Sequence, residues 1–398
     1  MSNYPALYIL VKNPFVHRDY ERMGVEHLQR HFQVSILDCT AWLMPKAIET
    51  RVNPALRLAN LVPIFCLADL QSAIKGGDGF ALDYIGQFSL KAILLFHHLK
   101  KKQIKLVVID SGAYPLPSEV KISVFSKSKL AYALKSNYLH RVFGAICQKI
   151  LIKILTDQTP DFALVAGTSW RDYPRFRMAK KIIPAHSFDY ERYFYLKNAP
   201  PLRGFDYAVY LDENITDHED NVELGYSNPV SSKIFMPSFN RFLEAFEAVS
   251  GMQVLVAGYP TGRREERLDI FGGREIIYGQ TAELVREAKV VFAHASTAIS
   301  FAILWRRPVI FLTSCEMIRS WYQPWIAAPC NILNSTLVNI DSDQPDQDNL
   351  ERWRTIDDAA YLKYKETYIK TAESPEAANW DIFTEVKLHD PKQPRDIN

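Results

Sequence analysis

Polar side chains able to bind anions or move protons gather after an apolar run near residue 290. The run Val290–Ala293 is typical of a buried parallel strand, and His294, Ser296 and Thr297 follow it. Apolar residues then recur at helical spacing, so these three side chains are expected where a strand ends and a helix begins. That edge of an open α/β sheet binds ligands, and hydroxyl and N–H groups there can hold a phosphate or carboxylate. The alternative is that Ser296 only caps the helix and His294 fills a turn.

A second group, of acidic and imidazole side chains, follows the apolar run Tyr207–Leu211. Asp212 stands at the carboxyl end of this predicted strand, and His218 lies in the acidic loop that comes next. A carboxylate in a crevice can act as a general base on a sugar hydroxyl when burial raises its pKa toward neutrality. We therefore predict Asp212, His218 and His294 as catalytic candidates. Alternatively, the loop binds a divalent ion through its oxygens or is an acidic surface loop.

A glycine- and arginine-containing loop follows a further predicted strand and supplies candidate donor contacts. Tyr259, Pro260 and Arg263 lie in it. A guanidinium offers a fixed fork of donors to phosphate or carboxylate, which suits an anionic ligand. The alternative is an ordinary basic loop.

Candidate acceptor contacts lie in the first half of the chain. His17, Arg18 and Tyr20 stand between the first predicted strand and the first helix, at the edge where α/β sheets bind ligands. His186 and Asp189 come at the end of this half, from where they can reach a crevice between two domains.

The elements that must position these residues alternate between strands and helices. Strands are predicted at Leu7–Val11, Val34–Leu37, Lys105–Asp110, Asp161–Ala166, Lys181–Pro184, Tyr207–Leu211, Val254–Ala257, Val290–Ala293 and Pro308–Leu312. Helices are predicted at Tyr20–His31, from near Asp83 to Lys101, and at Ser238–Val249, Thr281–Glu287, Thr297–Trp305 and Leu350–Thr371. Such alternation predicts an α/β protein with parallel sheets covered by helices on both faces.

The length of 398 residues exceeds the usual size of a single core, so we expect two doubly wound, Rossmann-like domains. The first spans 1–200 on the acceptor side, and a Pro-rich stretch at 198–204 is the expected linker. The second spans 205–345. A crossover helix is predicted within 346–375, and the polar tail at 376–398 is expected to be loosely ordered.

Composition and missing motifs exclude several function classes. The five cysteines lack metal-ligand spacing, which indicates a reducing compartment and argues against structural zinc. No apolar run of 18 residues occurs, and the N-terminus lacks a signal-peptide pattern. We therefore expect a cytoplasmic protein. The signatures of P-loop kinases, zincins, serine hydrolases and dinucleotide enzymes are absent. We expect no metal and no cofactor.

Charge is unevenly distributed although the net charge is only +2. The segment 91–153 holds twelve Lys or Arg against two acidic residues, interleaved with apolar side chains. Such a segment suits anionic lipid headgroups or an anionic acceptor, which predicts peripheral contact with a membrane. The alternative is a solvated helical face. Nucleic acid is not expected, because overall charge is near neutral and no binding module is recognisable.

Four segments carry a family resemblance: HSFDYERY (186–193), YAVYLDENITDHED (207–220), GYP (258–260) and HASTAISFAILWRRPVIFLTS (294–314). With the alternating halves, they resemble GT-B glycosyltransferases, and more narrowly uncharacterised proteins of bacterial surface-carbohydrate (capsule or O-antigen) clusters. Bacterial sialyltransferases and Kdo transferases are distantly similar. The resemblance implies that Ser296 and Thr297 surround the donor's phosphate and that Glu316 holds donor hydroxyls. Tyr259-Pro260 stands where those enzymes carry His-Pro.

The resemblance implies a glycosyltransferase that needs no metal. It would move a sugar from a nucleotide-sugar, either a CMP-linked acidic sugar or a UDP-sugar, to a surface glycan or lipid-linked glycan at the inner membrane face. The domain 205–345 would bind the nucleotide-sugar. Helix dipole, hydroxyls and basic side chains would stabilise the departing phosphate. The alternatives are a nucleotide-sugar epimerase, a polyol-phosphate transferase, or a non-catalytic glycan-assembly protein.

Overall fold

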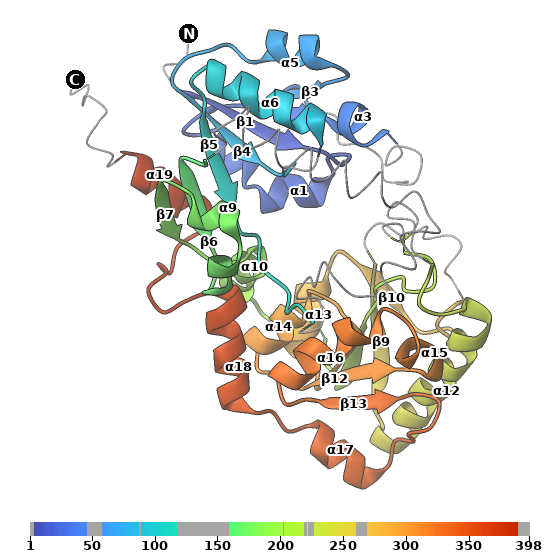
Figure 1. Ribbon diagram of the computed structural model, residues 1–398. Coiled ribbons are helices and arrows are strands. Elements are labelled where there is room, and N and C mark those ends of the chain that lie inside the picture. The colour runs from blue at the N-terminus through green and yellow to red at the C-terminus, as the bar shows by residue number, and fades with distance from the viewer. Residues whose placement is uncertain are drawn as a thin grey trace, which may run out of the picture.

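A computed structural model describes residues 4–45, 58–86, 89–117, 159–201, 203–218, 221, 227–259 and 269–388. The chain forms two α/β lobes, one built from the first half and one from the second (Figure 1). Residues 118–153 of the basic segment, together with Pro260 and Arg263, lie outside the described residues.

The first lobe is built on a seven-stranded sheet whose strands are all parallel. Its strands are β1 (Ala6–Val11), β2 (Gln33–Asp38), β3 (Leu61–Pro63), β4 (Gly79–Asp83), β5 (Lys105–Ile109), β6 (Phe162–Val165) and β7 (Lys181–Pro184). They lie in the order β3-β2-β1-β4-β5-β6-β7. The strand order therefore reverses between β1 and β4, the switch point at which open α/β sheets bind ligands.

The second lobe repeats this plan on a six-stranded parallel sheet. Its strands are β8 (Tyr207–Leu211), β9 (Gln253–Gly258), β10 (Ile276–Tyr278), β11 (Val290–Ala293), β12 (Val309–Thr313) and β13 (Thr336–Asn339). The order β10-β9-β8-β11-β12-β13 places the switch point between β8 and β11. These are the strands that end at Asp212 and His294, so topology brings the two predicted clusters together. The prediction of two doubly wound domains is confirmed.

Helices cover both sheets. In the first lobe they are α1 (His17–Arg22), α2 (Val25–Leu28), α3 (Thr40–Leu43), α5 (Leu67–Ala73), α6 (Leu90–Lys101), a 3-10 turn η2 (Ser169–Asp172), α9 (Pro174–Arg177) and α10 (Phe188–Leu196). In the second they are α12 (Ser232–Ser250), α13 (Thr281–Glu287), α14 (Ile299–Leu304), α15 (Cys315–Ile318), α16 (Gln323–Ile332), α17 (Gln347–Trp353) and α18 (Asp358–Tyr364).

Apolar periodicity explains how the helices attach to the sheets. In α12 the aromatic residues Phe235, Phe239, Phe242 and Phe246 recur at helical spacing and are at most 2% exposed. They pack against the sheet, as in the edge-to-face contact of Phe246 with Phe292 of β11. Burial of this aromatic face fixes α12 against the second sheet.

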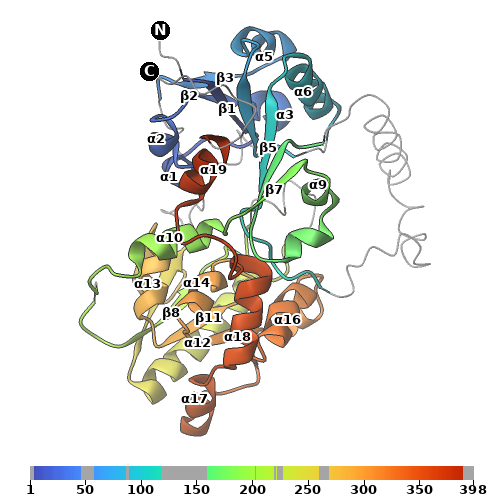
Figure 2. The same ribbon diagram turned by 90° about the vertical axis from the view of Figure 1, so that its left-hand side faces the viewer.

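The chain returns to the first lobe after completing the second. α18 continues into a π-helix, η4 (Lys365–Ile369). Lys370 then forms an isolated antiparallel β-bridge with His186, which follows β7 in the chain. The last helix, α19 (Asn379–Leu388), packs on the first lobe (Figure 2). This return is the predicted crossover, but the predicted single helix Leu350–Thr371 is wrong. Residues 354–357 separate α17 from α18.

Three other predictions require correction. The tail from residue 376 was predicted to be loosely ordered, but its residues up to Leu388 are ordered. Trp380 and Phe383 of α19 are buried in the first lobe's core. The predicted helix Tyr20–His31 is two helices, because Gly24 between them has a left-handed φ of 53°. The helix predicted from near Asp83 begins only at Leu90, capped by Ser89, since Asp83 ends the central strand β4. Among the described helices, none is long and apolar enough to cross a bilayer.

Candidate active site

A large cleft lies between the lobes, at the carboxyl edges of both sheets. Its volume is about 1960 Å³. The first lobe contributes α1, the start of α10 and part of α19, and the second contributes the segments that follow β8, β9 and β11. Of the predicted site residues, the cleft is lined by His17, Arg18, Tyr20, Asp189, Asp212, His218, Tyr259, Ser296 and Thr297.

Asp212 lines the cleft, but both oxygens of its carboxylate accept hydrogen bonds from backbone N–H groups. Its Oδ1 accepts the N–H of Asn214 and its Oδ2 accepts the N–H of Tyr259, both at 2.9 Å. The carboxylate therefore ties the end of β8 to the loop after β9. The side chain is nearly buried, with Asp212 only 8% exposed.

Glu213 holds the other side of the switch point. Its carboxylate accepts the N–H groups of His294 and Ala295 at 3.0 Å and the hydroxyl of Tyr322. Burial raises the pKa of Glu213 to about 7, against the hydrogen bonds that lower it. The N–H groups of His294 and Ala295, at the end of β11, are therefore occupied by Glu213.

His294 lies behind the cleft wall. It is 0% exposed, its Nδ1 is 2.7 Å from the carbonyl oxygen of Leu312, and Tyr210 and Phe235 pack edge-on against its ring. Burial lowers the pKa of His294 to about 4, so the imidazole is neutral at pH 7. The sequence suggested a catalytic imidazole, whereas in this conformation the ring has no direct path to a ligand and packs β11 against α12.

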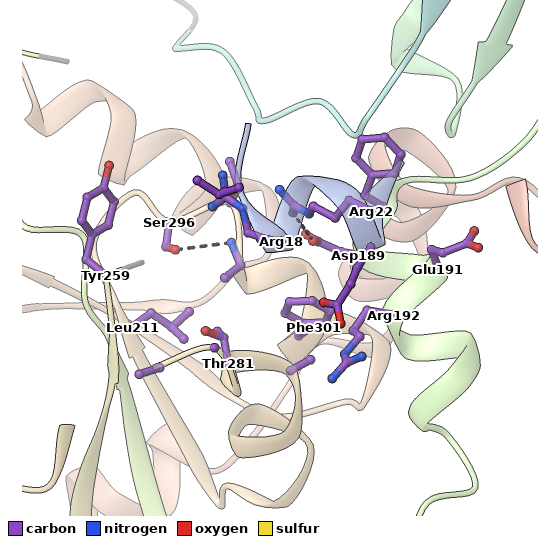
Figure 3. A pocket seen from close by; sticks show the side chains of 18 of the residues that line it. Arg18, Arg22, Asp189, Glu191, Arg192, Leu211, Tyr259, Thr281, Ser296 and Phe301 are labelled. Atoms are coloured by element: carbon purple, nitrogen blue, oxygen red, sulfur yellow. Dashed lines mark hydrogen bonds and ion pairs between the residues drawn. The ribbon is translucent and has the colours of Figure 1, made fainter. Parts of the chain in front are cut away.

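Ser296 and Thr297 form the part of this segment that does reach the cleft. The Oγ of Ser296 accepts the N–H of Ala298 at 3.3 Å (Figure 3). α14 begins only at Ile299, two residues later than predicted, and its N-cap is Ala298, so Ser296 is not the cap residue. The two hydroxyls are therefore placed at the cleft edge of the second lobe.

His218 and Tyr259 form a pair on the same wall. The Nε2 of His218 lies 3.3 Å from the hydroxyl of Tyr259, and their ring centroids are 5.2 Å apart. The pair joins the loop after β8 to the loop after β9, and the backbone N–H of Tyr259 also donates to Asp212.

The opposite wall is formed by α1 and α10 of the first lobe. Arg18 is half-exposed and lies 3.5 Å from Asp19, and His17 lies 3.7 Å from Glu21. Arg22, one turn after Arg18, contacts Asp189 of α10 at 3.3 Å. Figure 3 shows Arg22 and Asp189 pointing toward one another, with Phe301 below them.

Besides His294, two predicted residues lie outside the cleft. His186 is 1% exposed, and its Nε2 lies 2.8 Å from the carbonyl oxygen of Ala377, so it belongs to the junction of β7 with the returning chain. Glu316 accepts the N–H of Ser231 at 3.3 Å, just before α12 begins. Both side chains fasten elements of the fold.

Several cleft residues were not singled out from the sequence. They include Glu213, Trp321, Tyr322, Trp325 and the ion pair of Arg192 with Glu283. The aromatic sequence WYQPW at 321–325 was the available signal, since aromatic side chains gather in ligand sites. Within the described ranges, no three His, Cys, Asp or Glu side chains are grouped to hold a metal ion.

Two facing, doubly wound lobes with a C-terminal return to the first lobe define the GT-B architecture. A solved structure from Listeria monocytogenes, provisionally assigned as a UDP-N-acetylglucosamine 2-epimerase, matches with a TM-score of 0.50. It is 10% identical, and the match covers 99% of this chain and 98% of that one. At this identity the likeness concerns the fold alone.

Two glycosyltransferase structures match less well. The glycotransferase of kitacinnamycin has a TM-score of 0.48 at 11% identity, covering 97% of this chain and 96% of its own. MurG from Acinetobacter baumannii has a TM-score of 0.46 at 9% identity, covering 96% and 99%. No family model matches the sequence, and no curated protein matches it. The GT-B assignment rests on the strand order and on the match to the Listeria structure.

Proposed function

We propose that this protein is a GT-B glycosyltransferase that transfers a sugar from a nucleotide-sugar to a glycan acceptor. The observation that carries the proposal is the composition of the cleft. One wall, from the first lobe, presents arginines and a carboxylate, and the other presents hydroxyls at the switch point of a Rossmann-like sheet. A two-substrate transfer needs such a division, with the donor on one lobe and the acceptor on the other.

In the proposed reaction the donor's phosphate lies near Ser296 and Thr297, whose hydroxyls donate hydrogen bonds to its oxygens. Arg18 adds positive charge from the opposite wall, so charge developing on the leaving phosphate is stabilised from both lobes. Closure of the lobes excludes water and limits hydrolysis of the donor. The donor is proposed to be a CMP-linked acidic sugar or a UDP-sugar.

Binding of the nucleotide is the first test. Thermal unfolding is followed with CMP, UDP, GDP and their sugars, where a ligand at 100 times its dissociation constant stabilises by about 2.7 kcal/mol. The double variant Ser296→Ala/Thr297→Val should lose most of the shift. Ser72→Ala is the matched control, because Ser72 is an exposed hydroxyl on α5 of the other lobe. If no nucleotide stabilises the wild-type protein, the donor site does not exist.

Product analysis then decides among the enzyme classes that share this architecture. A transferase releases nucleotide only when acceptor is present and yields a glycosylated acceptor. A nucleotide-sugar epimerase changes the sugar without any acceptor, and a polyol-phosphate transferase moves the phosphate with its alcohol. A non-catalytic assembly protein binds nucleotide without turnover. Any of these last three results would replace the proposal.

A membrane-associated acceptor is part of the proposal. Within the described part of the basic segment, α6 exposes Leu90, Leu94, His97 and Lys101 along one face. The face combines apolar contact area with positive charge, which suits a bilayer that contains anionic lipids.

A further inference from the structure

The carboxylates of the cleft differ in how their oxygens are used. Asp212 accepts two backbone N–H groups, and Glu213 accepts two more together with the Tyr322 hydroxyl. The oxygens of both carboxylates are thus used to hold the backbone loops of the switch point. Asp189 instead pairs with side chains, Arg22 of α1 and Ser300 of α14. Side-chain partners can rearrange when a proton arrives.

The position of Asp189 is fixed by the elements around it. It lies in the first turn of α10, whose N-cap Ser187 accepts the N–H of Tyr190. Its partner Arg22 lies over the ring of Phe188, 5.7 Å from the centroid. The side chain of Asp189 is 13% exposed and lines the cleft, so it stands at the cleft wall while largely withdrawn from water.

The same helix places Asp189 beside the proposed donor site. α10 packs against α14, and the turn that leads into α14 carries Ser296 and Thr297. A carboxylate from the first lobe therefore lines the same cleft as Ser296 of the second lobe, and Figure 3 shows Arg18 between the two in this view.

We infer that Asp189 is the general base that removes the proton from the acceptor's attacking hydroxyl, an inference that rests on the proposed transferase function. The acceptor oxygen forms the new bond to the anomeric carbon as its proton moves to the carboxylate of Asp189. The bond from the anomeric carbon to the phosphate oxygen breaks, and its electron pair leaves with the nucleotide. The substrate class is thus an acceptor with a free alcohol, and Arg22 is a positioning residue that aligns the carboxylate.

The electrostatics agree with this role. Burial raises the pKa of Asp189, while the charges of Arg22 and Arg18 lower it in part. From the second lobe it faces the neutral hydroxyls of Ser300 and Tyr364. A carboxylate with a raised pKa is a stronger base than an exposed one, yet it must be deprotonated to act. The rate should therefore fall as pH drops through the pKa of Asp189.

The experiment compares three variants with wild type in a donor–acceptor assay. Asp189→Asn should lower kcat by about 100-fold or more, the usual contribution of a general base, with the nucleotide-induced thermal shift retained. Asp189→Glu should recover part of the rate. Arg22→Gln should move the acidic limb of the pH–rate profile to higher pH, because a cation that lowers the pKa is lost. Asp358→Asn, an exposed acid-to-amide change on α18, should behave as wild type.

The outcomes separate the inference from the function on which it rests. If the wild-type protein transfers no sugar from any donor, the proposed function fails. If it does transfer and Asp189→Asn stays within about 3-fold of the wild-type kcat, Asp189 is not the base. Loss of the nucleotide-induced shift in Asp189→Asn, or an unmoved acidic limb in Arg22→Gln, would also overturn the inference, since either would indicate a purely structural role.

Discussion

Asn379 and His186, 193 residues apart, exchange two hydrogen bonds: the backbone N–H of His186 donates to Asn379 Oδ1 at 3.1 Å, and Asn379 Nδ2 donates to the carbonyl oxygen of His186 at 2.9 Å. Both residues are at most 1% exposed. The pair fastens the start of α19 to the junction of β7 and α10, directly before Asp189. The chain's return to the first lobe therefore supports the wall that carries the proposed base.

Asn379→Ala should destabilise the protein by about 2–4 kcal/mol. The change leaves two buried backbone groups of His186 without partners, and each such group costs about 1–3 kcal/mol. Urea unfolding measures the loss. The control Asn349→Ala removes a partly exposed amide on α17, whose hydrogen bonds lie at the surface, and should cost less than about 1 kcal/mol. Equal losses of unfolding free energy in both variants would show that the buried hydrogen bonds of Asn379 contribute no more to stability than surface ones.

Gly24→Ala should be more damaging than an ordinary change at a left-handed glycine. A Cβ on Gly24 would lie 2.1 Å from the ring of Trp380, so α1, α2 or α19 must move. Gly251 is the matched control, because it has a similar φ of 68° but open space around its Cβ position. Gly251→Ala should cost about 1–2 kcal/mol from backbone strain alone.

The difference between the two variants measures the contact with α19. In Trp380→Ala, which removes the ring, Gly24→Ala should cost no more than Gly251→Ala. A Gly24→Ala penalty that persists without the ring would show that the clash is not its cause. Guanidinium unfolding of the wild-type protein, the three single variants and the Gly24→Ala/Trp380→Ala double variant gives this comparison.

These contacts also show what the sequence could and could not predict. The strands Tyr207–Leu211 and Val290–Ala293 were predicted with the observed limits, because continuous apolar runs identify strands buried on both faces. The limits of the edge strand Lys181–Pro184 were also predicted, although this strand is largely exposed. The ends of these strands also indicated where the candidate site residues lie. α19 was missed because its charged tail resembles a loose terminus, and only the buried contacts of Trp380 and Phe383 with the first lobe order it.

The site was predicted in part for a similar reason. Strand ends located Asp212 and His294 correctly, but periodicity does not say which side chains point into the cleft. His294 follows the last residue of β11 and is drawn into the aromatic cluster beneath α12, whereas Ser296 turns outward. The pairing of Arg22 with Asp189 joins residues 167 positions apart, so no local sequence pattern predicts it.

Membrane binding through α6 can be tested with vesicles. The protein should sediment with vesicles that contain about 30% anionic lipid, and less so as salt rises, because screening shortens the range of the lysine charges. Leu90→Ser/Leu94→Ser should weaken sedimentation through loss of buried apolar area. Leu362→Ser is the control, since Leu362 on α18 and Leu90 are both 56% exposed. Equal sedimentation of all three proteins, or binding to neutral vesicles alone, would contradict the proposal.

Glu213→Gln should change how stability depends on pH. The folded-state pKa of Glu213 is about 7 and its ordinary value is 4.5, so the folded protein binds this proton more tightly than the unfolded chain does. The stability from Glu213 is therefore fully present below pH 4.5 and is lost as pH rises through 7. His294 acts in the opposite sense, because its folded-state pKa is about 4 against 6.5, and its contribution is lost as pH falls from 6.5 to 4.

In wild type the two trends partly cancel, and Glu213→Gln removes only the first. Relative to wild type, the variant should therefore gain stability between pH 5 and pH 8, by about 3 kcal/mol at most, since one pKa unit corresponds to about 1.4 kcal/mol. Urea unfolding at pH 5, 6, 7 and 8 measures the difference. Glu351→Gln, an exposed change on α17, should give a difference that is flat with pH. A flat difference for Glu213→Gln as well would mean that this carboxylate is not held in a water-excluded site, and the tie between β8 and β11 would need another explanation.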